Sequence, residues 1–145
     1  MRHLIDRVGL RSRLTQYGAL PYRRTSGGVQ IMLVTSRASG QWIVPKGWLT
    51  LGLAPHVSAA KEAYEEAGVV GTAAEIPIGV FPHLKSTTGQ RLRVVVFPME
   101  VTQELDHWPE RFQRRRQWYN PDQAARAVTD TSLRKMIMSF RPDEA

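Results

Sequence analysis

The amino-acid sequence predicts an α/β (α+β) fold, with a mixed β-sheet sandwiched between helices. Three observations support this: an apolar strand pattern early in the chain, an amphipathic helix in its middle, and further strands before two C-terminal helices. This order argues for a mixed sheet, since a purely parallel sheet needs strands and helices to alternate regularly. We expect one domain over residues 1–145, with a basic N-terminal arm at about residues 1–20.

Local sequence signals give the expected order of elements. A short apolar, β-branched run predicts a strand, whereas apolar residues three and four apart predict a helix face. Pro55 suits the first turn of a helix, and Gly68 suits the position just past its end. The expected elements are strands at 29–35, 41–44, 76–84, 91–101 and 118–119, a loop at 46–54, and helices at 55–67, 121–128 and 131–140.

The composition is that of a globular protein, with 42% hydrophobic and 23% charged residues. No apolar run reaches the roughly 18–20 residues of a membrane span. The absence of cysteine excludes disulfides and thiolate sites, and it agrees with the cytoplasmic location that we expect. The arginine-rich start indicates a basic arm of the domain, and a transit peptide is the alternative.

The net charge of +7 indicates an anionic partner. Arginine greatly outnumbers lysine among the 20 basic residues, and its planar guanidinium grips phosphate through two hydrogen bonds. Nucleic acid, a membrane surface and a polyphosphorylated small molecule all fit this charge. A genome rich in G and C would raise the arginine content equally well, without any anionic partner.

Three glutamates in the 55–67 helix form the most informative pattern. At about 100° per residue, Glu62, Glu65 and Glu66 share one arc of about 100°. Like charges at this spacing repel each other, and a hard divalent cation would remove that repulsion. Because only oxygen ligands are offered, the pattern favours Mg²⁺, or Mn²⁺, over zinc. A solvated acidic helix face is the alternative.

The loop before this helix completes a pattern that resembles the Nudix box, G-x5-E-x7-R-E-U-x-E-E-x-G-U, where U is apolar. The matching residues are Gly47, Glu62, Ala63, Glu65, Glu66, Gly68 and Val69. Leu53 stands where the pattern has Glu, and Lys61 stands where it has Arg. In the family these two side chains are thought to brace the loop against the helix, so the departures indicate altered bracing more than altered chemistry.

The resemblance implies a Nudix fold and a metal-dependent hydrolase. Glu62, Glu65 and Glu66 would be the catalytic residues and metal ligands, and Gly47 would let the loop backbone approach the metal or phosphate. Three stretches resemble the branch that contains diphosphoinositol polyphosphate phosphohydrolases and diadenosine polyphosphate hydrolases. They are 35–37 with 41–45, the box continuing to residue 71, and 114–119.

A polyphosphorylated substrate would need several cations beside the metals. The resemblance implicates Arg37 and one or more of the run Arg114–Arg116, while Arg91 and Arg93 share one face of a strand. Surface arginines that only keep the protein soluble are the alternative reading for each of them. The expected phosphate ligands are Arg37, Lys46, Arg91, Arg93, Arg114, Arg115 and Arg116.

The function that we expect is hydrolysis of a phosphoanhydride bond in a diphosphoinositol polyphosphate, a dinucleoside polyphosphate or a related compound. One alternative is an RNA 5′-pyrophosphohydrolase. Another is a Nudix-fold module that binds nucleotide or RNA with weak catalysis, which the residues Leu53 and Lys61 favour. The expected partner is a polyphosphorylated small molecule rather than nucleic acid, with no membrane partner, in a monomer or homodimer.

Overall fold

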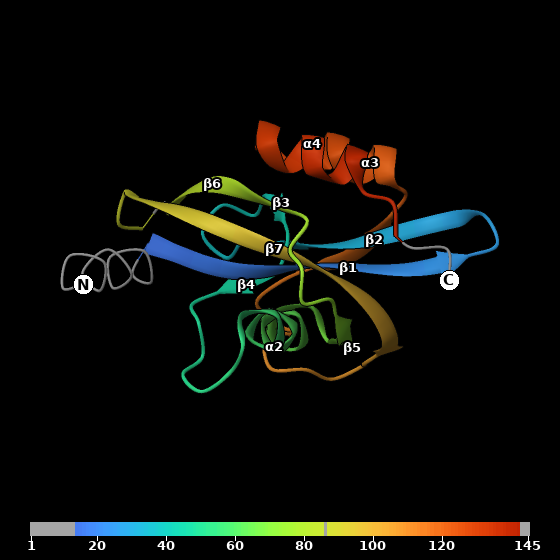
Figure 1. The fold of residues 1–145 in the computed structure, drawn as a ribbon, viewed down its shortest axis with the longest axis horizontal. Helices are drawn as coiled ribbons and strands as arrows, with labels where there is room; N and C mark the ends of the chain where they lie inside the picture. Colours follow the sequence, from blue (N-terminus) through green and yellow to red (C-terminus); the bar gives the residue numbers. More distant parts are fainter. Residues whose placement is uncertain (1–13, 86, 143–145) are drawn as a thin grey trace.

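A β-sheet with helices on both faces forms the core of the computed structural model, which describes residues 14–85 and 87–142 (Figure 1). Helix α2 lies on one side of the sheet, and helices α3 and α4 lie on the other (Figure 1). The helices are α2 (Pro55–Ala67), α3 (Pro121–Ala127) and α4 (Thr131–Ser139). Among the residues described, no helix is long and apolar enough to cross a membrane.

The sheet is mixed, as the sequence predicts. Its main path runs β3-β2-β1-β7-β5, with β4 paired to β1, β6 to β7, and β8 to β2. The β1–β7 pair is parallel and the other pairs are antiparallel. The strands are β1 (Thr15–Thr25), β2 (Gly28–Thr35), β3 (Trp42–Ile43), β4 (Lys46–Gly47), β5 (Val69–Ala73), β6 (Gly79–Lys85), β7 (Gln90–Glu104) and β8 (Arg116–Tyr119).

Strand β1 corrects the expected extent of the basic arm. Residues 15–20, which the sequence assigns to that arm, belong to this central strand, and residues 1–13 lie outside the described part of the chain. Gly18 and Pro21 weaken the strand signal in the sequence. Pro21 is tolerated because β1 pairs with β4 up to Gly18 and with β2 from Tyr22, so its missing N–H falls between the two pairings.

Strands β4 and β5 were also not predicted. Strand β4 has two residues and lies within the expected loop at 46–54. Strand β5 has a register shift between Val70 and Gly71, and a side chain at Gly71 would collide with the backbone of Glu100. A strand that needs a glycine for close backbone approach carries a weak β pattern.

Two apolar clusters, one on each face of the sheet, make up the core. Helix α2 packs small side chains, Ala59, Ala63 and Ala67, against one face, so its backbone lies close to the strands. Helices α3 and α4 cover the other face, where Leu33 and Phe81 are buried. Strands β1, β2 and β7 contribute to both clusters because successive side chains point to opposite faces.

The core assignment predicts a strong contrast between two leucines. Replacing Leu33, which is 0% exposed, with alanine is expected to cost about 2–5 kcal/mol of unfolding free energy. Replacing Leu51, which is 98% exposed, is expected to change it by less than about 0.5 kcal/mol. Urea denaturation of both variants measures this, and equal midpoints for the two would contradict the assigned core.

Candidate active site

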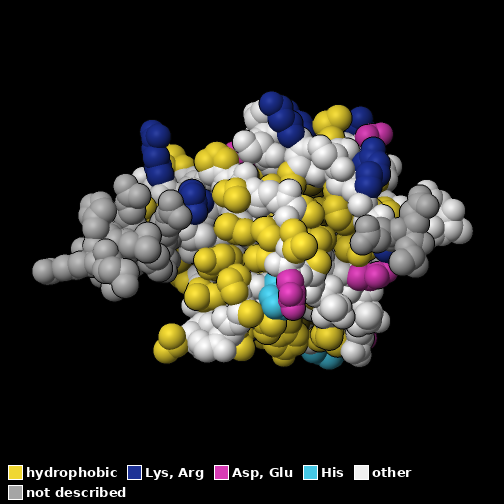
Figure 2. Space-filling view, in the orientation of Figure 1, with side chains coloured by type: hydrophobic (Ala, Val, Ile, Leu, Met, Phe, Trp, Pro, Cys, Tyr) yellow, Lys and Arg dark blue, Asp and Glu magenta, His cyan; other side chains and the backbone are white. Residues whose placement is uncertain are grey.

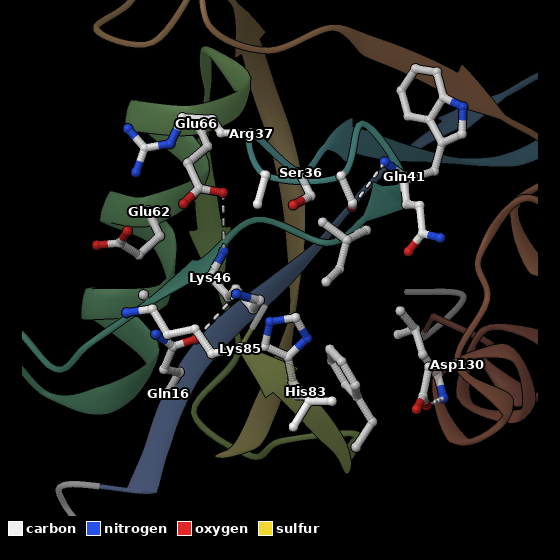
Figure 3. Close-up of a pocket in the computed structure, with 18 of the residues that line it drawn as sticks. Gln16, Ser36, Arg37, Gln41, Lys46, Glu62, Glu66, His83, Lys85 and Asp130 are labelled. Atoms are coloured by element: carbon white, nitrogen blue, oxygen red, sulfur yellow. Dashed lines mark hydrogen bonds between the residues drawn. The ribbon is translucent and has the colours of Figure 1, made fainter. Parts of the chain in front are cut away.

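A cavity of about 1010 Å³ opens beside the glutamate face of α2 (Figure 3). Glu62 and Glu66, one helical turn apart, both line it. Helix α2 ends at Gly68, whose φ of 66° is the left-handed conformation that commonly closes a helix. The local sequence thus positions both carboxylates at the cavity wall, as predicted.

Glu65 lies differently from its two neighbours. Its carboxylate forms an ion pair with Lys61 Nζ, one turn earlier on the helix, at a distance of 2.7 Å. Glu65 does not line the cavity. Among residues 14–85 and 87–142, no three carboxylate or imidazole groups stand close enough together to hold one metal ion. The role of Glu65 as a metal ligand therefore stays a prediction.

Gly47 lies directly against the Glu62 carboxylate. A Cβ at position 47 would collide with both carboxylate oxygens of Glu62, so only glycine leaves room for that carboxylate. The backbone N–H of the adjacent Lys46 points at Glu66 Oε1, with an N–O distance of 3.4 Å. Strand β4 thus brings its backbone to both carboxylates, and the approach of Gly47 to a metal or phosphate stays a prediction.

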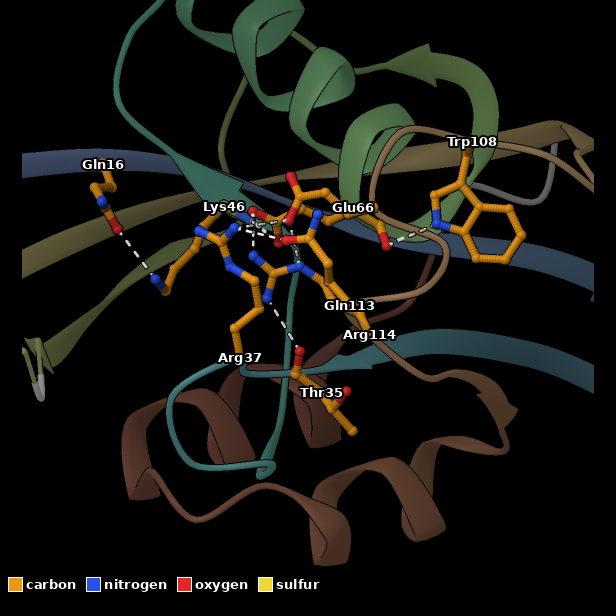
Figure 4. A network of polar contacts seen from close by, with 9 residues as sticks. Gln16, Thr35, Arg37, Lys46, Glu66, Trp108, Gln113 and Arg114 are labelled. Atoms are coloured by element: carbon orange, nitrogen blue, oxygen red, sulfur yellow. Dashed lines mark hydrogen bonds and ion pairs between the residues drawn. The ribbon is translucent and has the colours of Figure 1, made fainter.

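Arg114 ties the buried carboxylate to the rest of the site (Figure 4). Its guanidinium lies 3.4 Å from Glu66 Oε2, donates to Glu110 Oε1 at 2.9 Å, and donates to the carbonyl of Thr35 at 3.0 Å. Arg114 and Glu66 are both almost completely buried. This arginine therefore holds three segments together besides adding positive charge to the cavity wall.

Two further cations line the cavity as predicted. Arg37 donates to Gln113 Oε1 at 2.8 Å and lies 3.8 Å from Glu110, joining two loops at the cavity (Figure 4). Lys46 Nζ donates to Gln16 Oε1 at 3.2 Å. Their hydrogen-bond partners Gln113 and Gln16 are neutral amides, which a bound anion could replace.

The other predicted phosphate ligands do not line the cavity. Arg116 donates to the carbonyls of Ala67 and Gly68 at the C-terminal end of α2, which is the favourable end for a cation. Arg115 stacks over Trp42, with 5.5 Å from its guanidinium carbon to the ring centroid. Arg91 and Arg93 are exposed on β7, opposite Leu84 and Pro82 of β6.

The loop before α2 is held by contacts other than the Glu and Arg side chains that the family pattern has at positions 53 and 61. Ser58, fully buried in α2, accepts a hydrogen bond from the backbone N–H of Thr50 at 3.0 Å. Leu53 donates from its backbone to the carbonyl of Thr50, and Lys61 pairs with Glu65. The loop is therefore braced through Ser58 despite the departures at positions 53 and 61.

Burial governs the protonation of the site. It raises the pKa of the Glu66 carboxyl to about 8, against a smaller lowering by Arg114, and it also raises the pKa of Glu62. Burial lowers the pKa of the Lys46 amine, and burial with nearby Lys46 lowers the pKa of the His83 imidazole to about 4. His83 is therefore neutral at pH 7.

These residues fit a divalent cation. The donors offered are carboxylate oxygens, which suit Mg²⁺ or Mn²⁺. A carboxylate as buried as Glu66 is costly to ionise, and a cation beside it would favour the ionised form.

Several cavity residues were not found from the sequence. Gln16 lies on the unpredicted strand β1, and Glu110 and Asp130 lie outside any recognisable motif. His83 also lines the cavity, although no sequence motif marks it. Alternation along β6 could have indicated it, because Phe81, His83 and Lys85 are two residues apart and all face the cavity.

The raised pKa of Glu66 predicts a pH-dependent stability in the protein without divalent cations. The ordinary carboxyl pKa is 4.5. The free energy of unfolding that the raised pKa of Glu66 contributes is therefore fully present below about pH 4.5 and is lost as pH rises through about 8. Urea unfolding in EDTA between pH 5 and pH 9 should show a smaller decline for Glu66→Gln than for the wild type. The exposed control Glu75→Gln should decline like the wild type, and equal slopes for all three would contradict the prediction.

Comparisons with known proteins identify the family of this chain. A profile described as the NUDIX domain matches residues 14–140. The protein named "Nudix hydrolase 17, mitochondrial" from Arabidopsis thaliana is 31% identical over 127 residues, which are 83% of this chain and 69% of the relative. "Diphosphoinositol polyphosphate phosphohydrolase 2" from Rattus norvegicus is 30% identical over 125 residues, which are 85% of this chain and 65% of that protein.

A solved structure extends the agreement to the fold. The C. elegans Ap4A hydrolase, in a binary complex, superposes with a TM-score of 0.72 at 18% identity, covering 86% of this chain and 93% of that one. The family resemblance that the sequence predicts is thereby confirmed, and so is the mixed sheet between helices. The chain belongs to the Nudix hydrolase family.

Proposed function

We propose that this Nudix hydrolase cleaves a phosphoanhydride bond in a polyphosphorylated small molecule, with Mg²⁺ or Mn²⁺ bound at Glu62 and Glu66. The observation that supports this most directly is the convergence of these carboxylates, the Gly47 backbone and the cations of Lys46, Arg37 and Arg114 on one cavity. A cavity that offers both anionic and cationic groups suits a phosphate chain bridged by metal ions.

The cations would bind and orient the substrate. Arg37 and Lys46 lie at the wall with polar partners that a phosphate can replace, namely Gln113 and Gln16. Arg114 is already engaged by Glu66 and Glu110, so its main effect is to position those carboxylates. Arg37, with a planar fork, suits a bidentate phosphate contact.

The carboxylates would hold the cation and accept a proton. A bound divalent cation neutralises charge on the phosphate oxygens and makes a nearby water more acidic. Water adds to one phosphorus, the anhydride P–O bond breaks with its electron pair leaving on the second phosphate, and a Glu62 or Glu66 carboxylate oxygen takes up the water proton. Glu65 would join the metal ligands only after release from Lys61.

The remaining expectations are part of this proposal. We place the protein in the cytoplasm, as a monomer or homodimer. The alternative of a weakly catalytic binding module rests on Leu53 and Lys61, and the hydrogen bond from Thr50 to Ser58 weakens that argument. An RNA 5′-pyrophosphohydrolase would need an extended basic surface with exposed aromatic residues leading from the cavity.

Phosphate release with Mg²⁺ tests the proposal. The panel comprises a diadenosine polyphosphate, a diphosphoinositol polyphosphate, inorganic polyphosphate, a nucleoside triphosphate and 5′-triphosphate RNA. Glu66→Gln is expected to lower kcat at least about 100-fold on any substrate that the wild type cleaves, whereas the exposed control Glu75→Gln should match the wild type. If the protein hydrolyses none of these compounds but binds one of them tightly, the result would contradict the hydrolase function and favour the binding module.

Gly47→Ala tests the contact between β4 and Glu62. The added methyl would displace a flexible carboxylate rather than a packed core, so kcat should fall while the unfolding midpoint changes little. Steady-state kinetics and urea denaturation measure the two effects. Full activity in this variant would show that the position of the Glu62 carboxylate against Gly47 is unimportant.

A further inference from the structure

Helix α2 covers its side of the sheet only in part. The ring centroid of His56, at the start of α2, lies 6.3 Å from that of Phe97 on β7. Alternate residues of a strand share one face, so Val95, Arg93 and Arg91 continue this row toward the β6–β7 hairpin. Val95 is partly buried against the α2 cluster, whereas both arginines are exposed. The sheet face beside the hairpin therefore faces outward without a covering helix.

This uncovered face combines an apolar row with a cationic row. Leu84 lies opposite Arg91 on the neighbouring strand, and their side chains point to the same face. Pro82 lies opposite Arg93 in the same way. Leu84 is 62% exposed, and Val80, farther along β6, is 48% exposed. The two arginines, which the sequence predicts as phosphate ligands, thus lie on an amphipathic surface outside the cavity.

The loop between β4 and α2 adds apolar side chains at the same end of the molecule. Residues 48–53 (WLTLGL) carry no charge, and Leu49 is 42% exposed and Leu51 98% exposed. The Lys85 ammonium lies 5.4 Å from the ring centroid of Trp48, which connects this loop to the hairpin. A surface segment that exposes several large apolar side chains marks an interaction site.

The figures place these parts together. The β6–β7 hairpin, the start of β1 and the β4–α2 loop all lie at the left end of the molecule in Figure 1. Figure 2 shows basic side chains at the upper part of this end and a hydrophobic side chain that projects at its lower part. Apolar and basic groups therefore meet on one end of the protein.

The segments that form this end contain no carboxylate. Residues 46–61 and 76–99 include neither Asp nor Glu. Their basic residues are Lys46, Lys61, Lys85, Arg91 and Arg93. Residues 1–13, which lead into the start of β1 and lie outside the described part of the chain, add four arginines and one aspartate. The positive charge of the chain is therefore concentrated at the end that also exposes leucines, and its partner is anionic.

We infer that this end of the molecule, formed by the β6–β7 hairpin and the β4–α2 loop, binds the surface of an anionic lipid bilayer. Leu51 and Leu84 enter the boundary between headgroups and acyl chains, and Arg91 and Arg93 bind lipid phosphates. Peripheral binding of this kind combines burial of apolar side chains with attraction between basic residues and anionic lipids. Trp48 suits the same boundary, because tryptophan is enriched at membrane–water interfaces.

A bilayer fits this surface better than other anionic or apolar partners. Single-stranded nucleic acid is bound by aromatic rings that stack on its bases, whereas the side chain that projects farthest into solvent here is the aliphatic Leu51. A second copy of the chain, related by a two-fold axis, would bring its own Arg91 and Arg93 against the same two arginines. The sequence predicts no membrane partner because no apolar run can span a bilayer, but a surface assembled from two separate segments needs no such run.

Cosedimentation with vesicles tests the inference. The wild-type chain should bind vesicles of equal parts phosphatidylcholine and phosphatidylserine, and it should bind phosphatidylcholine vesicles at least about 10-fold more weakly. Leu51→Gln should lower the partition coefficient about 10-fold, because it removes an inserted apolar side chain. Arg91→Gln combined with Arg93→Gln should lower it about 25-fold, and salt at about 1 M should weaken wild-type binding by screening the same charges.

Matched controls lie in the helices on the other side of the sheet. Met138→Gln removes a side chain of α4 that is 55% exposed, and Arg126→Gln combined with Lys135→Gln removes two exposed charges from α3 and α4. Both control proteins should bind the anionic vesicles like the wild type, with unchanged urea midpoints. Equal losses of binding in the control and test variants would show attraction by net charge alone and would overturn the inference.

The absence of cysteine allows a second readout, which reports on insertion. Leu51→Cys and Met138→Cys each provide a single attachment point for an environment-sensitive fluorophore. Emission should shift to shorter wavelength on the anionic vesicles for the label at position 51 and stay unchanged for the label at position 138. Equal responses of the two labels would contradict insertion of the β4–α2 loop.

Two further outcomes would overturn the inference. One is a wild-type protein that does not bind the anionic vesicles. The other is a dimer, found by sedimentation velocity without lipid, that Leu51→Gln dissociates, because the surface would then belong to a second copy of the chain. Leu51, Arg91 and Arg93 do not line the cavity, so these results do not depend on whether the protein is a hydrolase.

Discussion

The burial of the Glu66 carboxylate is the constraint on which the rest of the site depends. An ionised carboxylate out of water is costly unless it is hydrogen-bonded and paired. Arg114 supplies the partner, and the N–H of Lys46 supplies a weak additional donor. Arg114 also binds Glu110 and the carbonyl of Thr35. The buried Glu66–Arg114 pair therefore fixes helix α2, strand β4, the end of β2 and the loop after β7 with respect to each other.

The loop after β7 is held to the same helix end by its backbone. Leu105 donates to the carbonyl of Gly68, and Glu110 donates to the carbonyl of Glu65. The Trp108 indole donates to the carbonyl of Glu66, and Arg116 donates to the carbonyl of Ala67. The last carbonyls of a helix have no partners within it, so these contacts satisfy α2 and at the same time bring Glu110 and Arg114 to the cavity.

Local spacing made helix α2 and its carboxylates predictable. Strand β1 and the other cavity residues depend on tertiary contacts, which the local sequence does not show. The 3.6-residue period and the pattern around Gly47 placed Glu62 and Glu66 on one helix face, and both line the cavity, because this placement depends on residues close in sequence. Strand β1 escaped prediction because its stability comes from pairing with β7, about 80 residues later, rather than from its own propensity. Glu110 and Asp130 enter the cavity only through chain folding, and no local signal marks them.

The arginines show why composition alone misdirects a search for ligands. An arginine can cap a helix, stack on an aromatic ring or face solvent, and each use adds the same charge to the total. Arg116 caps α2 and stacks 3.9 Å above Trp108, while Arg23 lies 4.2 Å above Trp118, so these guanidinium groups are engaged in packing. The cavity wall carries four cations and four carboxylates, so the excess of positive charge in the whole chain does not describe the charge of the site.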